Sequence, residues 1–415
     1  MNDLHAVLRD ATDHLRADPT IAHKAWAAAH RRKRRRAVAM VLGAAASVAL
    51  VLGLATSWPT RAPDPSLAPQ PTPQPTESAH PSETGPRIDP TYDPTDWTDL
   101  PEYPVDLGYW LSPERPRPLA EFPAERASVA ISFFLSPEEA NLSVIGSDGE
   151  WRSIDVSGLT FADNGDYELG LSRHSLSPDG TRVALGQPDG VVVIDLRTAE
   201  QTHYPVAGLG ALWAGRTVSW TADGSAVLLA RAHVATRGPE DLAYQPGFRV
   251  DLGTGVVSRM QYDPDNAAQL ADGTVVADLW RQGQGHRIIA FGPDGSGTDW
   301  RGVQPYLGAP DSFSGYGSRW AIRREAMMNP DAVDGRSGFM AFEGDSPLAM
   351  LPVEGVENNG GGGRVVGWLD ESTLLVAMPG ADVLAGTVAW NVETGRLWRG
   401  PQILVNSRVS IAGQP

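Results

Sequence analysis

Residues 176–185 read Leu176-Ser177-Pro178-Asp179-Gly180-Thr181-Arg182-Val183-Ala184-Leu185, and residues 191–196 follow with Val-Val-Val-Ile-Asp-Leu. The Asp-Gly pair favours a tight turn, because glycine adopts a positive φ there and aspartate accepts backbone hydrogen bonds. Apolar residues on both sides of the turn predict short β-strands. The stretch therefore predicts a strand, a turn, a second strand and then a third strand that ends in another turn.

Variants of this pattern recur to the end of the chain. Turns on Asp-Gly or a related pair occur at residues 177–180, 221–224, 270–273 and 369–372. A repeat of about 40–50 residues that holds four short strands is typical of a β-propeller blade. Seven segments combine an apolar strand with a polar turn: residues 107–112, 142–149, 191–196, 248–255, 287–295, 338–344 and 387–395.

We therefore predict an all-β protein with a β-propeller over residues 103–415. Seven blades is the favoured number, and six is the alternative if the first hairpin, residues 107–122, only adds an edge strand. No inner hairpin precedes this first copy, and the chain ends with two further strand patterns at residues 402–405 and 408–412. We expect these C-terminal strands to join the N-terminal hairpin in one composite blade that closes the ring.

The stretch at residues 176–185 resembles the WD40-like repeat of TolB-type propellers, whose inner hairpin reads Ser-Pro-Asp-Gly before apolar residues. Residues 177–180 carry this motif in full, and residues 221–224 and 271–273 carry it with the proline replaced. The resemblance implies a fold rather than an activity. The layout of the whole chain also resembles actinobacterial single-pass membrane proteins with a basic cytoplasmic stub and an external propeller. Some membrane proteins with such stubs bind sigma factors.

Three segments are predicted before the propeller. Residues 1–36 hold nine Lys or Arg against four Asp and are expected to form a basic, partly helical cytoplasmic stub. Residues 37–57 contain no charged residue and are long enough for a transmembrane helix. The basic run on the N-terminal side orients the N-terminus to the cytoplasm and the propeller outside the cell membrane. Residues 58–102, rich in Pro, Thr and Ser, are expected to be a disordered linker.

A cleaved signal peptide is the alternative to the membrane anchor. The basic segment before residue 37 is long for a signal peptide, and the apolar segment exceeds a normal signal core. These lengths favour a retained single-pass anchor.

The composition excludes several kinds of site and partner. The chain has no cysteine, which excludes disulfides, thiol catalysis, Cys-ligated zinc and a lipid-modified cysteine. Residues 37–415 hold 25 basic and 46 acidic residues, and this balance disfavours a nucleic acid as the partner. Lys24 and Lys33 are the only lysines, so nearly all positive charge is arginine, as expected of GC-rich coding.

We predict no catalytic, cofactor-binding or metal-binding residue. The Asp-Gly pairs lack the ligand spacing of a calcium loop, and the histidines lack the spacing of a metal site. No Gly-x-Ser-x-Gly nucleophile elbow occurs. The aspartates of these pairs are Asp148, Asp179, Asp189, Asp223, Asp272 and Asp294; the histidines are His174, His203, His233 and His286, with His5, His14, His23 and His30 in the stub.

Most tryptophans are expected to pack in the core and between blades, with one or two as the alternative platform for a carbohydrate or peptide. Two long loops, residues 235–245 and 358–363, are the predicted partner surface, because long loops on one propeller face commonly carry binding. The tryptophans concerned are Trp110, Trp151, Trp213, Trp220, Trp280, Trp300, Trp320, Trp368, Trp390 and Trp398.

These features favour a non-enzymatic binding or scaffold module, held outside the membrane, for a protein, a peptide or a cell-wall glycan. One alternative is a transmembrane signalling protein whose residues 1–36 bind a cytoplasmic regulator such as a sigma factor. A second alternative is a propeller enzyme of the hydrolase or lactonase type. The fold alone does not choose among these functions.

Overall fold

The computed structural model describes residues 85–412 with internal gaps. The gaps are residues 109, 112–115, 134–140, 161–170, 210–216, 231–245, 280–285, 307–308, 326–335, 355–362, 379–383 and 405–406. The predicted stub (1–36), the predicted transmembrane helix (37–57) and the first part of the predicted linker lie outside the described residues. Within the described part, no helix is long and apolar enough to span a membrane.

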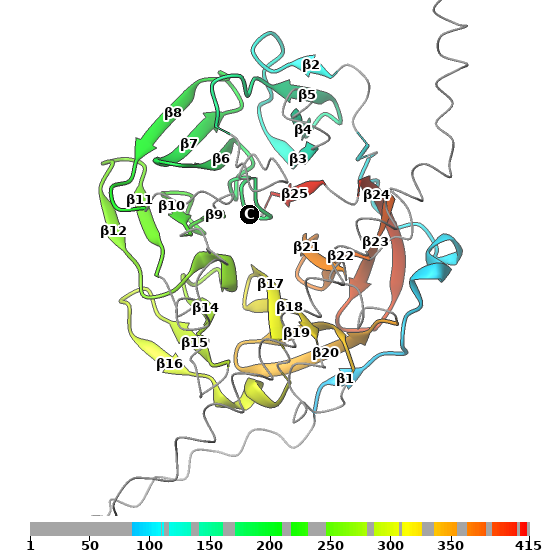
Figure 1. Cartoon of the computed structure of the whole chain (residues 1–415). Helices are drawn as coiled ribbons and strands as arrows, with labels where there is room; N and C mark the ends of the chain where they lie inside the picture. Colours follow the sequence, from blue (N-terminus) through cyan, green and yellow to red (C-terminus); the bar gives the residue numbers. More distant parts are fainter. Residues whose placement is uncertain are drawn as a thin grey trace, which may run out of the picture. The chain divides into compact units, whose positions relative to one another are not determined.

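The described strands form six β-sheets around a common axis, so the fold is a six-bladed β-propeller (Figure 1). We number the blades around the ring and count the strands of each blade outward from the axis. Blade 1 contains β25 (Arg408–Ile411), β3 (Ala127–Phe133), β4 (Asn141–Gly146), β5 (Trp151–Ile154) and β2 (Arg117–Pro118). Blade 2 contains β6 (Arg182–Gln187), β7 (Gly190–Asp195) and β8 (Gln201–Pro205), with Leu176 bridged to Val183 at its inner side.

The other four blades each begin with a complete inner strand. Blade 3 contains β9 (Val218–Trp220), β10 (Ala226–Leu229), β11 (Phe248–Asp251) and β12 (Val257–Arg259). Blade 4 contains β13 (Ala267–Gln269), β14 (Val275–Asp278), β15 (Ile288–Phe291) and β16 (Gly297–Asp299). Blade 5 contains β17 (Ala309–Tyr316), β18 (Arg319–Glu325), β19 (Gly338–Glu343), β20 (Ser346–Pro352) and β1 (Arg87–Ile88). Blade 6 contains β21 (Arg364–Trp368), β22 (Thr373–Ala377), β23 (Leu384–Asn391) and β24 (Leu397–Leu404).

The middle strands are continuous apolar runs because neighbouring blades cover both of their faces. All five residues of β22 and all four of β10 are buried. The outer strand β8 is instead exposed along most of its length. Apolar clusters between adjacent blades, such as the one that joins Phe339 of blade 5 to Trp390 of blade 6, therefore hold the ring together.

The prediction of seven blades is wrong. Six of the seven predicted copies form a strand of a blade: β4, β11, β15, β19 and β23 are third strands, and β7 is the second strand of blade 2, where only Leu176 among the described residues bridges β6 at the inner side. The first copy, residues 107–112, contains no strand among its described residues. Its Trp110 is only 1% exposed, packs in the cluster between blades 6 and 1, and donates its indole N–H to the Leu107 carbonyl at 2.7 Å. A local apolar pattern does not distinguish such a packed segment from a sheet strand.

Residues 87–118 run along the outer edges of three blades, and we call this segment the belt (Figure 1). β1 pairs in parallel with β20 of blade 5, Glu102 bridges Arg399 of blade 6, and β2 pairs in parallel with β5 of blade 1. Asp89 of the belt is buried and accepts the indole N–H of Trp390 at 2.7 Å. Residues 87–102, which the sequence assigns to the linker, thus pack on the propeller.

The C-terminal strand closes the ring at its axis. β25 pairs with β3 in an antiparallel register that matches Arg408 with Ser132 and Ile411 with Val129. The partner predicted for both C-terminal strand patterns is the hairpin at residues 107–122. The observed partner of β25 is β3, and residues 402–404 instead end β24, which pairs with β23 in blade 6. Blade 1 therefore combines the C-terminal strand β25 with β3, β4 and β5. The belt adds β2 at the outer edge of the same blade and so closes the ring a second time.

The propeller has two faces that differ in their connections. On one face, short segments join the first strand to the second and the third to the fourth, and we call it the turn face. On the opposite face the innermost strands begin, and we call it the axial face. Every gap in the description between β3 and β25 falls in a connection at the axial face. The two predicted loops, residues 235–245 and 358–363, lie outside the described residues except for Gly363.

Candidate functional site

The Asp-Gly pairs of the turn face are structural, as predicted. In five of the six pairs the glycine has a φ between 65° and 84°, and the aspartate accepts the backbone N–H two residues later. Arg152 also donates to Asp148, and this hydrogen bond is the main cause that lowers the pKa of Asp148 to about 2. The exception is Asp189 on the axial face, whose carboxylate lies 3.1 Å from Nε2 of His203 and whose Gly190 has no positive φ.

Three arginines at equivalent places join neighbouring blades on the turn face. Each lies at or just before the start of the strand that follows the first turn of its blade, namely β3, β6 or β18, and donates to a backbone carbonyl in the first turn of the next blade. Arg126 reaches Asp179 at 2.8 Å, Arg182 reaches Gly224 at 2.9 Å, and Arg319 reaches Glu371 at 2.6 Å. Arg182 also stacks over the ring of Trp220, with 4.7 Å from its guanidinium carbon to the ring centroid. The repeat thus supplies its own inter-blade contacts.

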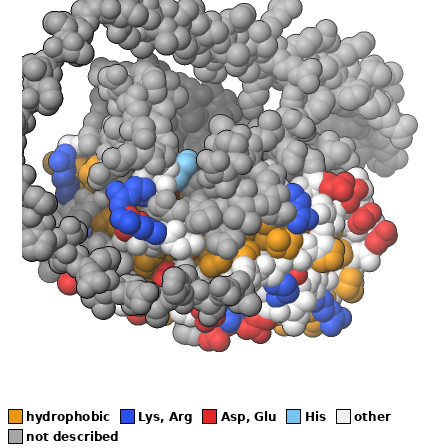
Figure 2. All heavy atoms as spheres, turned by 90° about the horizontal axis from the view of Figure 1, so that it is seen from below, with side chains coloured by type: hydrophobic (Ala, Val, Ile, Leu, Met, Phe, Trp, Pro, Cys, Tyr) orange, Lys and Arg blue, Asp and Glu red, His pale blue; other side chains and the backbone are white. Residues whose placement is uncertain are grey.

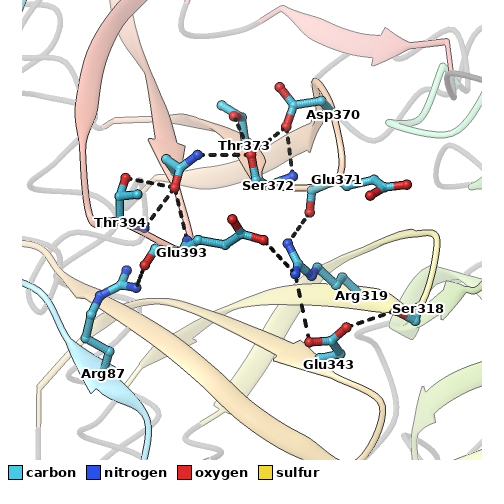
Figure 3. Close-up of polar contacts among 11 residues, drawn as sticks. Arg87, Ser318, Arg319, Glu343, Asp370, Glu371, Ser372, Thr373, Glu393 and Thr394 are labelled. Atoms are coloured by element: carbon cyan, nitrogen blue, oxygen red, sulfur yellow. Dashed lines mark hydrogen bonds and ion pairs between the residues drawn. The ribbon is translucent and has the colours of Figure 1, made fainter.

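Arg319 shows how completely such a charge is partnered (Figure 3). Its guanidinium lies 2.9 Å from Glu393 and 3.8 Å from Glu343, in addition to its bond with the Glu371 carbonyl. Its side chain is only 15% exposed. Figure 2 shows the same mixing of signs more widely, with acidic and basic side chains next to one another over the described surface. The contacts of Arg319 join blade 5 to blade 6.

The axial face has a different arrangement around the innermost strands. β17 contains a β-bulge between Asp311 and Ser314, where Ser312 has a φ of 57°. The carbonyl of Phe313 in this bulge accepts hydrogen bonds from Nη1 of Arg173 at 3.1 Å and from Nε2 of His174 at 3.0 Å. A β-bulge turns backbone groups away from the hydrogen bonds that they would form between regular strands. The bulge of blade 5 thereby holds two side chains that come from blade 2.

Two more arginines lie near Arg173. Arg364 begins β21 of blade 6, and Arg408 begins β25 of blade 1. Arg364 donates to the carbonyl of Ser407 at 2.5 Å. Burial, as the main cause, and the positive charges of Arg408 and Arg173 together lower the pKa of Arg364 to about 10. Arg364 remains protonated at neutral pH. Arg364 and Arg408 thus begin the inner strands of blades 6 and 1, and Arg173 lies three residues before Leu176 at the inner side of blade 2. We call Arg173, Arg364 and Arg408 the axial arginines.

His174 is neutral at physiological pH. Burial is the main cause that lowers its pKa to about 4, and the charge of Arg173 acts in the same direction. Because a carbonyl only accepts, Nε2 of His174 carries the proton that it donates to Phe313. Nδ1 is then an acceptor. His174 still keeps part of its surface accessible, as do Arg173 and Arg364, while Arg408 is exposed.

A carboxylate also lies near this group. Asp265 lies in the short 3-10 helix Pro264–Asn266 between blades 3 and 4 and accepts a hydrogen bond from Thr217 at 2.9 Å. Its negative charge acts to raise the pKa of His174, against the larger effect of burial. The described charges at the axis therefore include three guanidinium groups and one carboxylate. Such a set can bind an anion by charge-assisted hydrogen bonds. It contains no nucleophile beside a general base.

The other described histidines each lie beside an aspartate. Nδ1 of His286 is 2.6 Å from Oδ2 of Asp278, which is buried, and the pair lies on the axial face of blade 4. His203 pairs with Asp189 at an exposed edge. His233 lies outside the described residues. Within the described residues, no group of three or more His, Asp or Glu is placed to hold a metal ion.

The tryptophans that the structure describes have packing roles. Trp110, Trp220, Trp320, Trp368 and Trp390 are buried, and Trp151, Trp300 and Trp398 pack against the clusters. Trp220 and Trp368 donate to carbonyls of the preceding blade, Ser175 at 2.8 Å and Ser314 at 3.3 Å. Trp213 and Trp280 lie outside the described residues. The prediction of core and inter-blade packing is confirmed for these eight.

The axial arginines are absent from the residues singled out in the sequence. A signal was present, because each of them precedes an apolar inner strand by at most a few residues. This sequence signal becomes informative only when the arrangement of the blades is known, because the axial arginines approach one another only when β25 packs at the axis.

Comparisons with known proteins point to the fold alone. No protein-family model matches the sequence, and no curated protein matches it. Among similar solved structures, TolB from Acinetobacter baumannii is 15% identical and has a TM-score of 0.45, over 71% of this chain and 69% of that one. The β-propeller domain of the Trilobed protease from Pyrococcus furiosus is 12% identical, with a TM-score of 0.40 over 68% of this chain and 96% of that one. Oligogalacturonate lyase from Vibrio parahaemolyticus is 12% identical, with a TM-score of 0.38 over 67% of this chain and 74% of that one.

Proposed function

We propose that the protein is a non-enzymatic binding module whose ligand, a protein, a peptide or a cell-wall glycan, is held at the axial face. The observation that carries this proposal is the convergence of Arg173, Arg364 and Arg408 from three adjacent blades. The positive charges of Arg408 and Arg173 disfavour the charged form of Arg364. On the turn face, Arg126, Arg182 and Arg319 donate to carbonyls of the next blade.

Site-specific photo-crosslinking of the full-length protein in its native membrane tests this assignment. One variant carries the photo-reactive residue at Arg408 on the axial face. The matched control carries it at Val256, which is 60% exposed in a turn on the opposite face. We expect a discrete crosslinked partner from position 408 and none from position 256. Adducts from position 256 without adducts from position 408 would overturn the proposal.

We further propose that residues 37–57 anchor this module in the cell membrane, with residues 1–36 in the cytoplasm. The support is the uncharged length of that segment and the basic run before it. Protease treatment of intact spheroplasts should digest the propeller and spare a small N-terminal fragment that stays with the membrane. Release of the whole chain by alkaline extraction would contradict the anchor.

A second candidate function is a propeller hydrolase, and one observation favours it. A buried Asp278 that binds Nδ1 of a half-buried His286 is the arrangement by which a carboxylate orients a general base. A broad hydrolase screen of the full-length protein and of His286→Gln tests this candidate. Turnover that His286→Gln abolishes would establish it in place of the binding module.

A further inference from the structure

We propose that the belt is a releasable clasp that holds the seam between blades 6 and 1 closed from outside, and that its release loosens β25 at the axis. The seam is the boundary at which the last blade of the ring meets the first (Figure 1). This clasp is a property of the ring itself, so it goes beyond the proposed binding of a ligand and does not depend on it.

Two segments cross this seam, and each is continuous in the chain with one blade and hydrogen-bonded to the other. On the inside, β25 follows β24 of blade 6 and pairs with β3 of blade 1. On the outside, the belt leads through β2 into blade 1, and its Glu102 bridges Arg399 of β24 in blade 6. In blades 3 to 6 the inner strand leads directly into the second strand, whereas the chain does not run from β25 into β3. Hydrogen bonds and packing must therefore hold this seam.

The belt also fills the seam with a side chain. Trp110 is only 1% exposed and packs in the same apolar cluster as Val409 of β25, Ile131 of β3 and Ala389 of β23. These residues come from both sides of the seam, from blade 1 and from blade 6. Burial of a tryptophan among them stabilises their contact. Release of the belt would take Trp110 out of this cluster and leave β25 with fewer apolar neighbours.

A seat for the belt is built into blade 6. Trp97 donates its indole N–H to the Thr387 carbonyl at 2.8 Å. A Cβ on residue 386 would lie 2.6 Å from Cδ1 of Trp97, so Gly386 leaves the room that the indole occupies. Strand β23 is bulged at this point, between Gly386 and Val388. Arg399 covers the indole, with 5.6 Å from its guanidinium carbon to the ring centroid. The seat thus matches one particular side chain of the belt.

Other contacts of the belt are suited to release. Arg399 donates to Glu102 at 2.7 Å, but the side chain of Glu102 is 80% exposed, and such a surface ion pair contributes little to stability. Ile88 and Val105 of the belt are largely exposed as well. The hydroxyl of Tyr92 is buried and finds no hydrogen-bond partner among the described residues. A buried hydroxyl without a partner is unfavourable, so this group favours the undocked belt.

Release of the belt would act on the axial face through β25. The Ser410 hydroxyl of β25 donates to the Arg173 carbonyl at 2.9 Å and accepts the Leu176 N–H at 2.9 Å. These two bonds tie the closing strand to the start of blade 2. When β25 leaves β3, this bridge breaks and Arg408, which begins the strand, moves with it. The clasp therefore connects the outer edge of the ring with its axis.

Thiol labelling of the full-length protein tests the clasp. The chain contains no cysteine, so a single introduced thiol reports local opening at one place. Val409→Cys places the thiol in β25, where Val409 is 4% exposed. Val227→Cys places it in β10 of blade 3, where Val227 is fully buried. The rate of labelling by iodoacetamide under native conditions is measured for each thiol, with the belt intact and with its seat altered.

Two substitutions alter the same seat from opposite sides. Trp97→Ala removes the belt side chain, and Gly386→Ala fills the room that this side chain needs. Each should raise the labelling rate at position 409 by about 10-fold or more, because a lost hydrogen bond and lost burial favour the open seam. The rate at position 227 should stay within about twofold of the original rate. The matched control is Val105→Ala on the exposed part of the belt, which should change neither rate.

The two thiol positions distinguish a clasp from a general loss of stability. The clasp is overturned if both seat variants label position 409 at the original rate. It is also overturned if labelling rises equally at positions 409 and 227, because the whole ring would then be opening. Should Val409→Cys fail to fold, Val129→Cys in β3, at a residue that is 2% exposed, reports on the same seam. Should Trp97→Ala fail to fold, Gly386→Ala decides the question.

Discussion

The two faces of this propeller are built by the same repeat and use arginine in opposite ways. On the turn face, Arg319 is surrounded by two carboxylates and a carbonyl that come from two blades (Figure 3). On the axial face, Arg364 is bound by a carbonyl and lies near two other guanidinium groups. The first arrangement joins opposite charges, whereas in the second the charges of Arg408 and Arg173 lower the pKa of Arg364.

This difference teaches where to look for function in a repeat ring. Side chains that satisfy one another are explained by stability alone. Side chains that the fold brings together at an energetic cost require another explanation, and perturbed ionisable groups are commonly found at functional sites. That criterion supports the proposed binding of a ligand at the axial face.

The largest expected effect is a loss of stability at a turn of the turn face. Gly180→Ala should lower the free energy of unfolding by about 3 kcal/mol, because residue 180 has a positive φ of 70° and the new Cβ would clash with the Ala127 carbonyl. Gly149→Ala is the matched control, because its φ is 79° and no atom lies within 4 Å of the new Cβ. It should cost about 1–2 kcal/mol. Urea denaturation measures both, and equal losses would show that the inter-blade contact is unimportant.

The second effect is a loss of stability in acid that belongs to the axial face. The folded protein holds the pKa of His174 at about 4, below its ordinary 6.5, so the unfolded chain binds the extra proton between these pH values. Stability from this group is complete above pH 6.5 and falls as the pH drops to 4, by on the order of 3 kcal/mol.

The control for this pH effect is His174→Gln, whose amide can still donate to the Phe313 carbonyl. Urea denaturation at pH 7 and pH 4 should show a smaller loss for His174→Gln than for the wild type. An identical pH dependence in the two proteins would mean that His174 is not held neutral.

The third effect is the difference in stability between removing the largely buried Arg319 and removing an exposed arginine. Arg319→Gln should lower the free energy of unfolding by about 1–2 kcal/mol, because it leaves Glu393 and the Glu371 carbonyl without their donor. Arg301→Gln removes an arginine that is 86% exposed and should change stability by less than about 0.5 kcal/mol. Denaturation curves of the two variants decide this, and an unchanged Arg319→Gln would remove the contrast between the faces.

The smallest expected effect is on the stability of Arg364→Gln. The variant loses the hydrogen bond to Ser407 and also the cost of a buried charge near Arg408 and Arg173. These changes are of similar size, so the free energy of unfolding should stay the same or rise by about 1 kcal/mol. Chemical denaturation checks this value. A loss as large as that of Arg319→Gln would make Arg364 a structural residue.

The propeller fold could be predicted from the sequence because most strands of a blade follow one another directly in the chain. Each Asp-Gly turn and the apolar runs beside it lie within one repeat, and Gly180 and Gly224 adopt the positive φ that their turns predict. The number of blades depends on distant pairing, which a local pattern does not contain. Residues 107–112 have the apolar character of a strand, yet they belong to a belt that packs on blades formed hundreds of residues later.

The candidate site depends on distant pairing even more strongly. Ser410 binds the Arg173 carbonyl across 237 positions in the chain, and the bulge of β17 reaches Arg173 across 140. No periodicity or motif in the sequence places these residues together. What the sequence does offer is an arginine at the start of an inner strand, and this feature becomes informative only when the ring is known.

The most direct test of this account is the photo-crosslinking comparison of the two faces in the full-length protein. One variant carries the photo-reactive residue at position 408 on the axial face, and the other carries it at position 256, which is 60% exposed on the turn face. We predict a discrete adduct with a partner from position 408 and none from position 256. Adducts from position 256 alone would contradict the assignment of the ligand to the axial face.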